Sequence, residues 1–202
     1  MSSRPSDAPY HTRDVQHFER WSRSYEGSWM QRRLFGPVHM AVLDLASPLG
    51  APVTLMDVGC GTGRLLRASA LRWPEARLIG VDPAEGMVEA ARALTPSATF
   101  YRSLAETLPL PDASVDLALS TLSFHHWGDQ AAGIHEIARV LRPGGHFILA
   151  DFAPPGILAR LRLTGRFQPA AARIRLLTDA GFHVERRQDV AYRWVLATVA
   201  VR

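Results

Sequence analysis

A glycine-rich turn flanked by two carboxylates has the residue types and spacing to bind a charged small molecule. The run Asp57-Val58-Gly59-Cys60-Gly61-Thr62-Gly63 follows an apolar stretch, and Asp82 ends a second apolar stretch 19 residues beyond Gly63. Glycines directly after a strand let backbone amides approach a ligand at the start of a helix. The pattern therefore predicts a ligand site at the edge where the first two strands end.

Three ligand classes compete for this turn. A dinucleotide fingerprint needs glycine at position 64, where the chain has Arg64, and a P-loop needs a lysine, which the chain lacks. Asp57 would repel a pyrophosphate but attract an ammonium group, and Asp82 could accept hydrogen bonds from both ribose hydroxyls of an adenosine. An alternative for Asp82 is an N-cap before Pro83. An adenosine with an ammonium group and no pyrophosphate describes S-adenosylmethionine.

Four segments of the chain then resemble one family. The segments 55–63, 78–87 and 105–116 and the run Leu141-Arg142-Pro143-Gly144-Gly145 are similar to class I S-adenosylmethionine-dependent methyltransferases, in the ubiquinone and menaquinone biosynthesis (type 11 domain) branch. The resemblance is dense over residues 50–151. It implies an α/β fold with a doubly wound, Rossmann-like sheet of seven mostly parallel strands in the order 3-2-1-4-5-7-6, with strand seven antiparallel and helices on both faces.

The resemblance also implies roles for individual residues. Gly59 and Gly61 would line the methionine part of the cofactor, with Asp57 near its amine. Asp82 would hold the ribose and Met87 would pack on the adenine. The remaining expected cofactor positions lie on the same segments: Cys60, Pro83, Ala105, whose backbone would read the adenine edge, Glu106 and Thr121. Leu104 departs from the family, which often has an acid there, because a leucine cannot accept a hydrogen bond from the adenine amine.

The periodicity of apolar residues supports the same fold independently. Apolar runs of strand length alternate with stretches of helical spacing, which is typical of βαβ units and a mostly parallel sheet. The predicted strands are 53–58, 77–81, 98–101, 115–120, 146–151, 182–189 and 191–201, and the predicted helices are 14–40, 64–73, 83–94, 129–141 and 169–180.

The first 40 residues are expected to differ in role from the rest. Trp21, Tyr25 and Trp29 recur at spacings of four, with Phe18 three residues earlier, so they share one helical face. We predict that residues 1–40 form a tail and a helical lid over the substrate, and that residues 41–202 form a single methyltransferase domain. The alternative is that this face simply packs on the core.

Candidate catalytic residues follow the fourth strand, at the carboxyl edge where open α/β sheets bind ligands. His125 and His126 lie there, and either could accept a proton if the methyl acceptor must lose one. A structural role for the pair is the alternative. Adjacent side chains point apart and no third ligand is evident, so no metal is expected.

Composition limits the remaining function classes. Cys60 is the only cysteine, which excludes an internal disulfide and a cysteine-based zinc site. No apolar run reaches the ~20 residues of a membrane span and the start lacks a signal-peptide core, so a cytoplasmic enzyme is expected. All 23 basic residues are arginine, and the net charge is +4. The basic excess lies in the flanks, but no run of arginines there is interleaved with aromatics, which disfavours nucleic-acid binding.

The function predicted from these observations is methyl transfer from S-adenosylmethionine to a small-molecule acceptor by in-line displacement. One alternative is an RNA- or protein-directed methyltransferase. An Asn-Pro-Pro-Tyr-type motif for a nitrogen acceptor is absent after the fourth strand, where Ser120-Thr121-Leu122-Ser123 stands instead. The other alternative is a non-catalytic domain that binds the cofactor as a scaffold. The sequence gives no indication of the oligomeric state.

Overall fold

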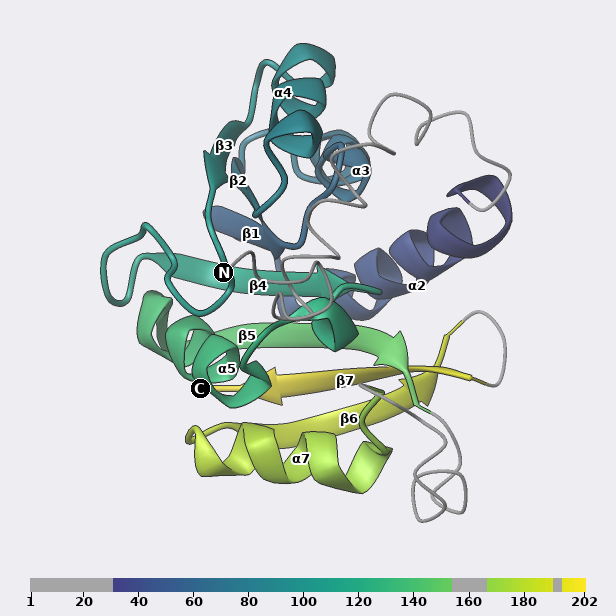
Figure 1. Cartoon of the computed structure of the whole chain (residues 1–202), viewed down its shortest axis with the longest axis vertical. Coiled ribbons are helices and arrows are strands. Elements are labelled where there is room, and N and C mark those ends of the chain that lie inside the picture. Colours follow the sequence, from purple (N-terminus) through teal and green to yellow (C-terminus); the bar gives the residue numbers. More distant parts are fainter. Residues whose placement is uncertain (1–30, 154–166, 191–193) are drawn as a thin grey trace, which may run out of the picture.

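A seven-stranded sheet forms the centre of the molecule. The computed structural model describes residues 31–153, 167–190 and 194–202 (Figure 1). The sheet has the order β3-β2-β1-β4-β5-β7-β6, which confirms the predicted topology. Its strands are β1 (Thr54–Val58), β2 (Arg77–Asp82), β3 (Thr99–Arg102), β4 (Val115–Thr121), β5 (Leu141–Phe152), β6 (His183–Asp189) and β7 (Val195–Val201).

The strand directions follow from how the connections cross the sheet. The five strands from β3 to β5 pair in parallel. Parallel neighbours need a connection that crosses back over a face of the sheet. β7 runs antiparallel to both β5 and β6, as predicted. All five residues of β1 are buried, which is typical of a central strand covered on both faces.

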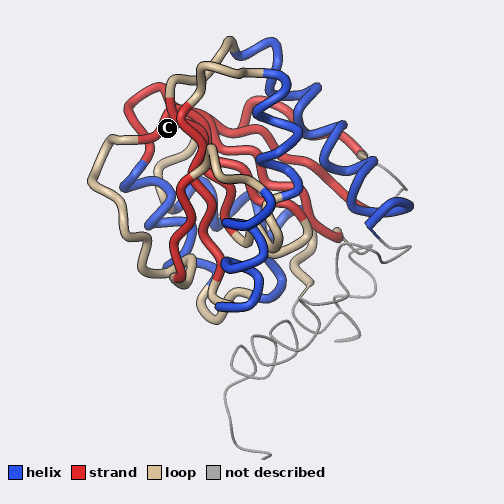
Figure 2. The backbone as a smooth tube through the Cα atoms, turned by 90° about the horizontal axis from the view of Figure 1, so that it is seen from above, coloured by secondary structure: helices blue, strands red, loops and turns tan. Residues whose placement is uncertain are grey.

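Helices cover both faces of this sheet (Figure 2). Side chains of α2, α3 and α4 contribute to one hydrophobic cluster, and side chains of α5 and α7 contribute to a second cluster on the opposite face. The arrangement is therefore doubly wound, as expected. The helices are α2 (Gly36–Ala46), α3 (Arg64–Arg72), α4 (Glu85–Leu94), α5 (Gln130–Val140) and α7 (Ala170–Asp179), with short turns η1 (Gln31–Phe35), η2 (Ser47–Leu49) and η3 (Phe124–His126).

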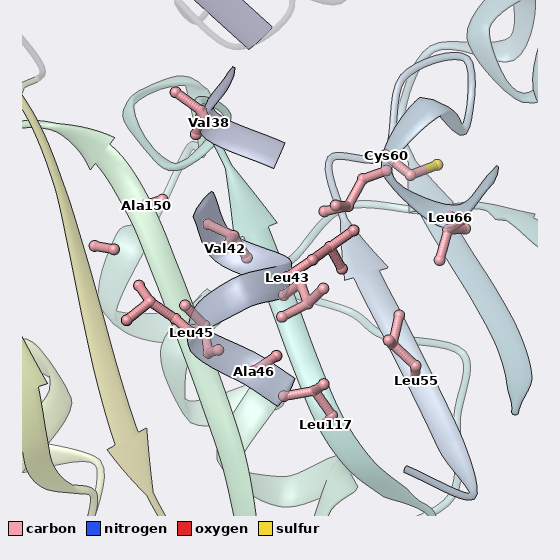
Figure 3. Close-up of a cluster of buried hydrophobic side chains, with 14 of the residues drawn as sticks. Val38, Val42, Leu43, Leu45, Ala46, Leu55, Cys60, Leu66, Leu117 and Ala150 are labelled. Carbon is pink, nitrogen blue, oxygen red and sulfur yellow. The ribbon is translucent and has the colours of Figure 1, made fainter. Parts of the chain in front are cut away.

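Helix α2 extends beyond the predicted end near Met40. Val42, Leu43 and Ala46 lie within it and are at most 1% exposed. These side chains belong to the same buried cluster as Leu55 and Leu117 of the central strands (Figure 3). The second half of the helix is therefore held by tertiary packing, which the aromatic spacing of the preceding residues did not reveal.

Two other boundaries differ from the prediction. Helix α4 begins at Glu85 instead of Pro83, because Asp82 accepts a hydrogen bond from the Ala84 amide (3.0 Å) and holds a turn before the helix. Strand β5 begins at Leu141, which pairs with Val115, whereas His146 already pairs with Leu117. The intervening exposed residues form an irregularity in the strand where a separate turn was expected.

No helix within the described ranges is long and apolar enough to cross a bilayer.

Candidate active site

The glycine-rich turn is tied to the end of β2 by its own backbone. The amides of Gly59 and Cys60 both donate to the Val81 carbonyl (2.8 and 3.1 Å). The Gly61 amide donates to Oδ2 of Asp82 (2.9 Å). The backbone φ is positive at Gly59, Gly61 and Gly63, a region that side-chain-bearing residues rarely adopt. The turn and Asp82 therefore lie together as predicted, at the carboxyl edge of β1 and β2.

Asp57 lies at the base of this turn with a carboxyl oxygen that has no partner. The residue is 1% exposed, and its Oδ1 makes no hydrogen bond to any part of the chain that the structure describes. Burial, with the negative charge of Asp82 nearby, raises the pKa of Asp57 to about 8. A buried carboxyl of this kind is costly unless it meets a donor or a cation. The structure thus fits the expected ammonium site.

Asp82 joins the glycine turn to helix α4. Its Oδ1 and Oδ2 accept from the Ala84 and Gly61 amides, so the residue takes part in local backbone structure as well as lying at the expected ribose position. Pro83 is half-buried beside it, and Met87 is buried in the first turn of α4. The ribose and adenine roles of these residues remain predictions.

Glycine is required at position 59 because the Ser123 side chain lies against it, a contact that the sequence did not reveal. A Cβ at this position would lie 2.3 Å from Oγ and 2.4 Å from Cβ of Ser123. The Ser123 hydroxyl donates to the Val58 carbonyl (2.9 Å) and lies 2.9 Å from the Ser120 hydroxyl. The turns after β1 and β4 therefore interlock, and the close approach at Gly59 includes protein as well as the expected cofactor.

We expect Gly59→Ala to lower the free energy of unfolding by about 1–3 kcal/mol, because the new methyl group overlaps Ser123 at a strained φ. Urea titration measures this change. In a Ser123→Gly background the same substitution should cost less, since the overlap is gone and only the φ strain is left. An equal cost in both backgrounds would contradict the interlock.

Cys60 behaves as a packing residue. It is buried, and its Sγ would lie 2.9 Å from a Cβ built on Gly80 of β2. Its burial and the nearby carboxylates raise the pKa of the thiol. A thiol held in its neutral form is a poor nucleophile, so Cys60 contributes packing to the loop, and its expected cofactor contact stays a prediction.

The segment after β3 presents the expected adenine-side residues. Ala105 is buried, and Leu104 beside it is 36% exposed although it is apolar. Glu106 accepts a hydrogen bond from the Asp129 amide (2.8 Å), just before α5. Glu106 therefore has a structural partner, and its cofactor contact stays a prediction, as does the backbone contact of Ala105.

The chain turns sharply after β4. Thr121 ends the strand and is buried, and Leu122 adopts a positive φ of 52°, which is unusual for a residue with a branched side chain. Its amide donates to the Ala150 carbonyl of β5 (2.8 Å). This turn leads into η3 and so carries His125 to the end of β5.

His125 lies against a buried carboxylate that ends β5. Its Nδ1 is 2.8 Å from Oδ1 and 3.0 Å from Oδ2 of Asp151, and its backbone amide donates to Oδ2 (2.9 Å). The His125 and His126 ring centroids are 3.9 Å apart. The two rings therefore lie together at the carboxyl edge, although adjacent side chains were expected to point apart, and His125 contacts Asp151.

A fully buried arginine from α7, Arg173, contacts the backbone of Asp151. Arg173 is 0% exposed and donates to the carbonyls of Leu196 (2.9 Å), Phe152 (2.8 Å) and Asp151 (3.3 Å). Burial lowers the pKa of its guanidinium, and the negative charge of Asp151 opposes that shift. Arg173 therefore fixes the ends of β5 and β7 below the histidine.

Sequence reasoning missed Ser123, Asp151 and Arg173. Asp151 ends an apolar strand in the same way as Asp57 and Asp82, and this recurrence was a usable signal. Arg173 had none, because one arginine among 23 gives no sign of being buried. The predicted lid residues Trp21, Tyr25 and Trp29 lie outside the described residues. Among the residues that the structure describes, no cluster of three His, Cys, Asp or Glu could hold a metal ion.

Comparison with known proteins places this arrangement in a family. Residues 56–149 match the family described as "Methyltransferase domain" (Methyltransf_11). A Mycolicibacterium smegmatis protein named "Probable S-adenosylmethionine-dependent methyltransferase" is 32% identical over 182 residues, which are 88% of this chain and 68% of that protein. The chain belongs to the class I S-adenosylmethionine-dependent methyltransferases.

Other relatives carry a more specific name. The malonyl-[acyl-carrier protein] O-methyltransferase of Dechloromonas aromatica is 37% identical over 153 residues, which are 75% of this chain and 53% of that protein. The enzyme of the same name from Xylella fastidiosa is 34% identical over 155 residues, covering 74% of this chain and 50% of the relative. The chain thus spans about half the length of these curated relatives.

Solved structures confirm the fold. A chain of the complex between the Haloferax volcanii Trm112 methyltransferase activator and a candidate methyltransferase is 26% identical, with a TM-score of 0.77 over 91% of this chain and 96% of that one. A SAM-dependent methyltransferase from Aquifex aeolicus has a TM-score of 0.71 at 20% identity, covering 92% of this chain and 97% of the other.

Proposed function

We propose that the chain transfers the methyl group of S-adenosylmethionine to a small-molecule acceptor by in-line displacement. The single observation that carries this proposal is the buried Asp57 carboxyl, whose Oδ1 has no partner within the described residues and lies beside a glycine turn tied to Asp82. Family membership supports the cofactor, and the relatives' names support methyl transfer.

The cofactor supplies a methyl group on a positively charged sulfur, and the protein supplies position. Asp57 would bind the ammonium group and Asp82 the ribose hydroxyls. The remaining predicted contacts complete the site: Gly59, Cys60, Gly61, Pro83, Met87, Ala105, Glu106 and Thr121. Most of the catalysis of such a displacement comes from holding the two reactants in line.

The acceptor class is a finer proposal. The relatives named malonyl-[acyl-carrier protein] O-methyltransferases favour an oxygen acceptor, either free or linked to a carrier. We further propose a cytoplasmic enzyme that needs no metal ion, and a lid formed by residues 1–40, which rests on the sequence alone.

Two measurements test this function. S-adenosylhomocysteine should raise the melting temperature of the chain and NAD should not, because a ligand stabilises the state that it binds. Cofactor labelled in its methyl group should then label a small molecule from a metabolite extract, also in the presence of EDTA. Stabilisation by NAD alone would overturn the cofactor assignment. Binding without any methyl transfer would leave only a cofactor-binding scaffold.

We expect Asp82→Ala to weaken S-adenosylhomocysteine binding by about 1–3 kcal/mol, because charge-assisted hydrogen bonds to the ribose are lost. Calorimetry gives the affinity, and Asp112→Ala is the matched control. Asp112 is a carboxylate whose side chain is 77% exposed and pairs with Arg139.

The Asp82 variant also disturbs the Gly61 amide, so a second comparison is needed. An analogue that lacks one ribose hydroxyl should bind wild type more weakly than the parent ligand, and Asp82→Ala should hardly distinguish the two ligands. If both proteins discriminate equally, Asp82 does not hold the ribose.

A further inference from the structure

We propose that Asp151 is a positioning residue that fixes His125 as the proton acceptor of the methyl transfer, and that the acceptor is therefore a hydroxyl compound. This inference rests on the proposed function and deepens it. It names a residue outside the sequence-predicted site and narrows the substrate class.

Asp151 has the geometry of a carboxylate that orients an imidazole. It is 1% exposed, and its oxygens accept from the Phe152 amide (2.6 Å) and the His125 amide (2.9 Å) while Nδ1 of His125 lies 2.8 Å away. Arg173 donates to the Asp151 carbonyl from below. These hydrogen bonds fix the orientation of the carboxylate, so the carboxylate determines the orientation of the His125 ring.

This contact decides which ring nitrogen can accept a proton. In a neutral imidazole, a carboxylate at Nδ1 selects the tautomer with the hydrogen on Nδ1 and leaves a lone pair on Nε2. Within the described ranges, the only hydrogen bonds of the His125 ring are those of Nδ1 to Asp151. The side chain is 13% exposed, so most of the ring is shielded while Nε2 is left without a protein partner in that part of the chain.

Aromatic contacts hold the ring plane. Phe167 lies at a centroid distance of 4.6 Å with an interplanar angle of 35°, and Phe152 meets the ring edge-on at 5.8 Å. His126 is the other titratable ring in contact, at 3.9 Å. Tilt and rotation of the imidazole are thus both restricted, which is the requirement for a general base in a preorganised site.

The chemistry that needs such a base is narrow. A hydroxyl oxygen attacks the methyl carbon, the carbon–sulfur bond breaks, and its electron pair stays on sulfur to give the neutral thioether. The hydroxyl proton passes to Nε2 of His125 and from there to water, so the products are a methyl ether, S-adenosylhomocysteine and one proton. A carboxylate acceptor is already ionised at neutral pH and would gain nothing from this base.

The first test reads the tautomer without an acceptor. In the 15N-histidine spectrum of the full chain bound to S-adenosylhomocysteine, the signals lost in His125→Gln should report a ring protonated on Nδ1 in its neutral form. Asp151→Asn should alter that signal. A ring protonated on Nε2 would overturn the proposal.

The second test uses the acceptor found by methyl labelling. We expect kcat to fall about 100-fold or more in His125→Gln and about tenfold or more in Asp151→Asn, with cofactor affinity within about twofold of wild type. The wild-type rate should rise with pH through one titration that His125→Gln lacks. The labelled product should survive alkali, as an ether does.

Asp116→Asn is the matched control. Asp116 also accepts from a backbone amide, that of Thr54 (2.6 Å), and from Arg142 (2.7 Å), but it lies at the start of β4, away from His125. It should lose stability without losing kcat. If Asp151→Asn does not fold, His125→Gln carries the same readouts.

The outcomes separate the two proposals. An alkali-labile product that releases methanol, or unchanged kcat and pH profile in the folded variants, overturns the roles of His125 and Asp151 and leaves the proposed function intact. Cofactor binding without any labelled product overturns both.

Discussion

Replacing Arg173 by methionine should lower the free energy of unfolding by about 3–5 kcal/mol, as measured by urea denaturation. The methionine fills much of the volume but leaves the carbonyls of Asp151, Phe152 and Leu196 without their donors. It also removes a positive charge that interacts with the buried Asp151. Leaving a buried carboxylate without its positive charge and buried carbonyls without their donors destabilises the folded state.

Arg142→Met provides the control for this prediction. Arg142 also pairs with a carboxylate, Asp116 (2.7 Å), but its side chain is 45% exposed. Such pairs contribute at most about 1 kcal/mol, so the control should be nearly neutral. If the two variants lose the same stability, burial does not govern the role of Arg173.

Arg173, Asp151 and His125 belong to one hydrogen-bonded network. Arg173 donates to the backbone carbonyls of Asp151 and Phe152. The Asp151 side chain accepts from the Phe152 amide and contacts Nδ1 of His125. We therefore expect the loss of Arg173 to be non-additive with Asp151→Asn, because the two residues share one network.

The sheet could be predicted because its signals are local and repeated. Apolar runs such as those of β1 and β2 end in an acid followed by a turn, and each lies where the pattern predicted a strand. The antiparallel β7 came from the family resemblance, since alternation of apolar residues does not give direction. The glycine-rich turn and Asp82 could be predicted to lie together because they lie at the ends of two neighbouring strands.

The unpredicted features depend on contacts between distant segments. Ser123 meets Gly59 across 64 residues of sequence, and Arg173 meets the end of β5 across 22. Hydrophobic periodicity describes the face of an element and carries no information about which polar group on another element it will meet. The predicted helix ended too early for the same reason, since the last residues of α2 are held by packing in a buried cluster that brings α2 against α3, β5 and β7.

Asp82 holds local backbone structure without capping a helix, because the N-cap residue of α4 is Ala84 and has no side-chain cap. It was expected either to hold a ribose or to cap a helix, and its oxygens accept from the Ala84 and Gly61 amides. An ionised carboxylate has about four acceptor positions, so one carboxylate can serve both local backbone structure and a ligand. The local bonds fix the orientation that the ribose contact would require.

Asp57 should make cofactor binding depend on pH. Its pKa is raised to about 8, so the ligand-free protein carries the protonated acid at neutral pH. An ammonium group favours the ionised form, and binding should therefore release about one proton at pH 7. The affinity for S-adenosylhomocysteine should rise by up to about tenfold per pH unit from pH 6 to near 8. Calorimetry in buffers of different ionisation enthalpy counts the protons.

The free energy of unfolding should change with pH in the opposite direction to the cofactor affinity. Between the ordinary pKa of an aspartate and about 8, the folded state holds a proton that the unfolded state has lost. The free energy of unfolding of the ligand-free protein should therefore fall as the pH rises through this window, by up to about 1.4 kcal/mol per unit. Asp57→Asn should remove this dependence and be the more stable protein at pH 8.

Asp57→Asn also isolates the cofactor contact. The variant should bind S-adenosylhomocysteine about 2–5 kcal/mol more weakly than wild type at pH 8, because a buried partner of the ammonium group loses its charge. Its affinity should change with pH only as the ligand's own amine titrates, so the difference between the two profiles belongs to Asp57. A wild-type protein that releases no proton on binding at pH 7, with an affinity that Asp57→Asn leaves unchanged, would remove Asp57 from the ammonium site.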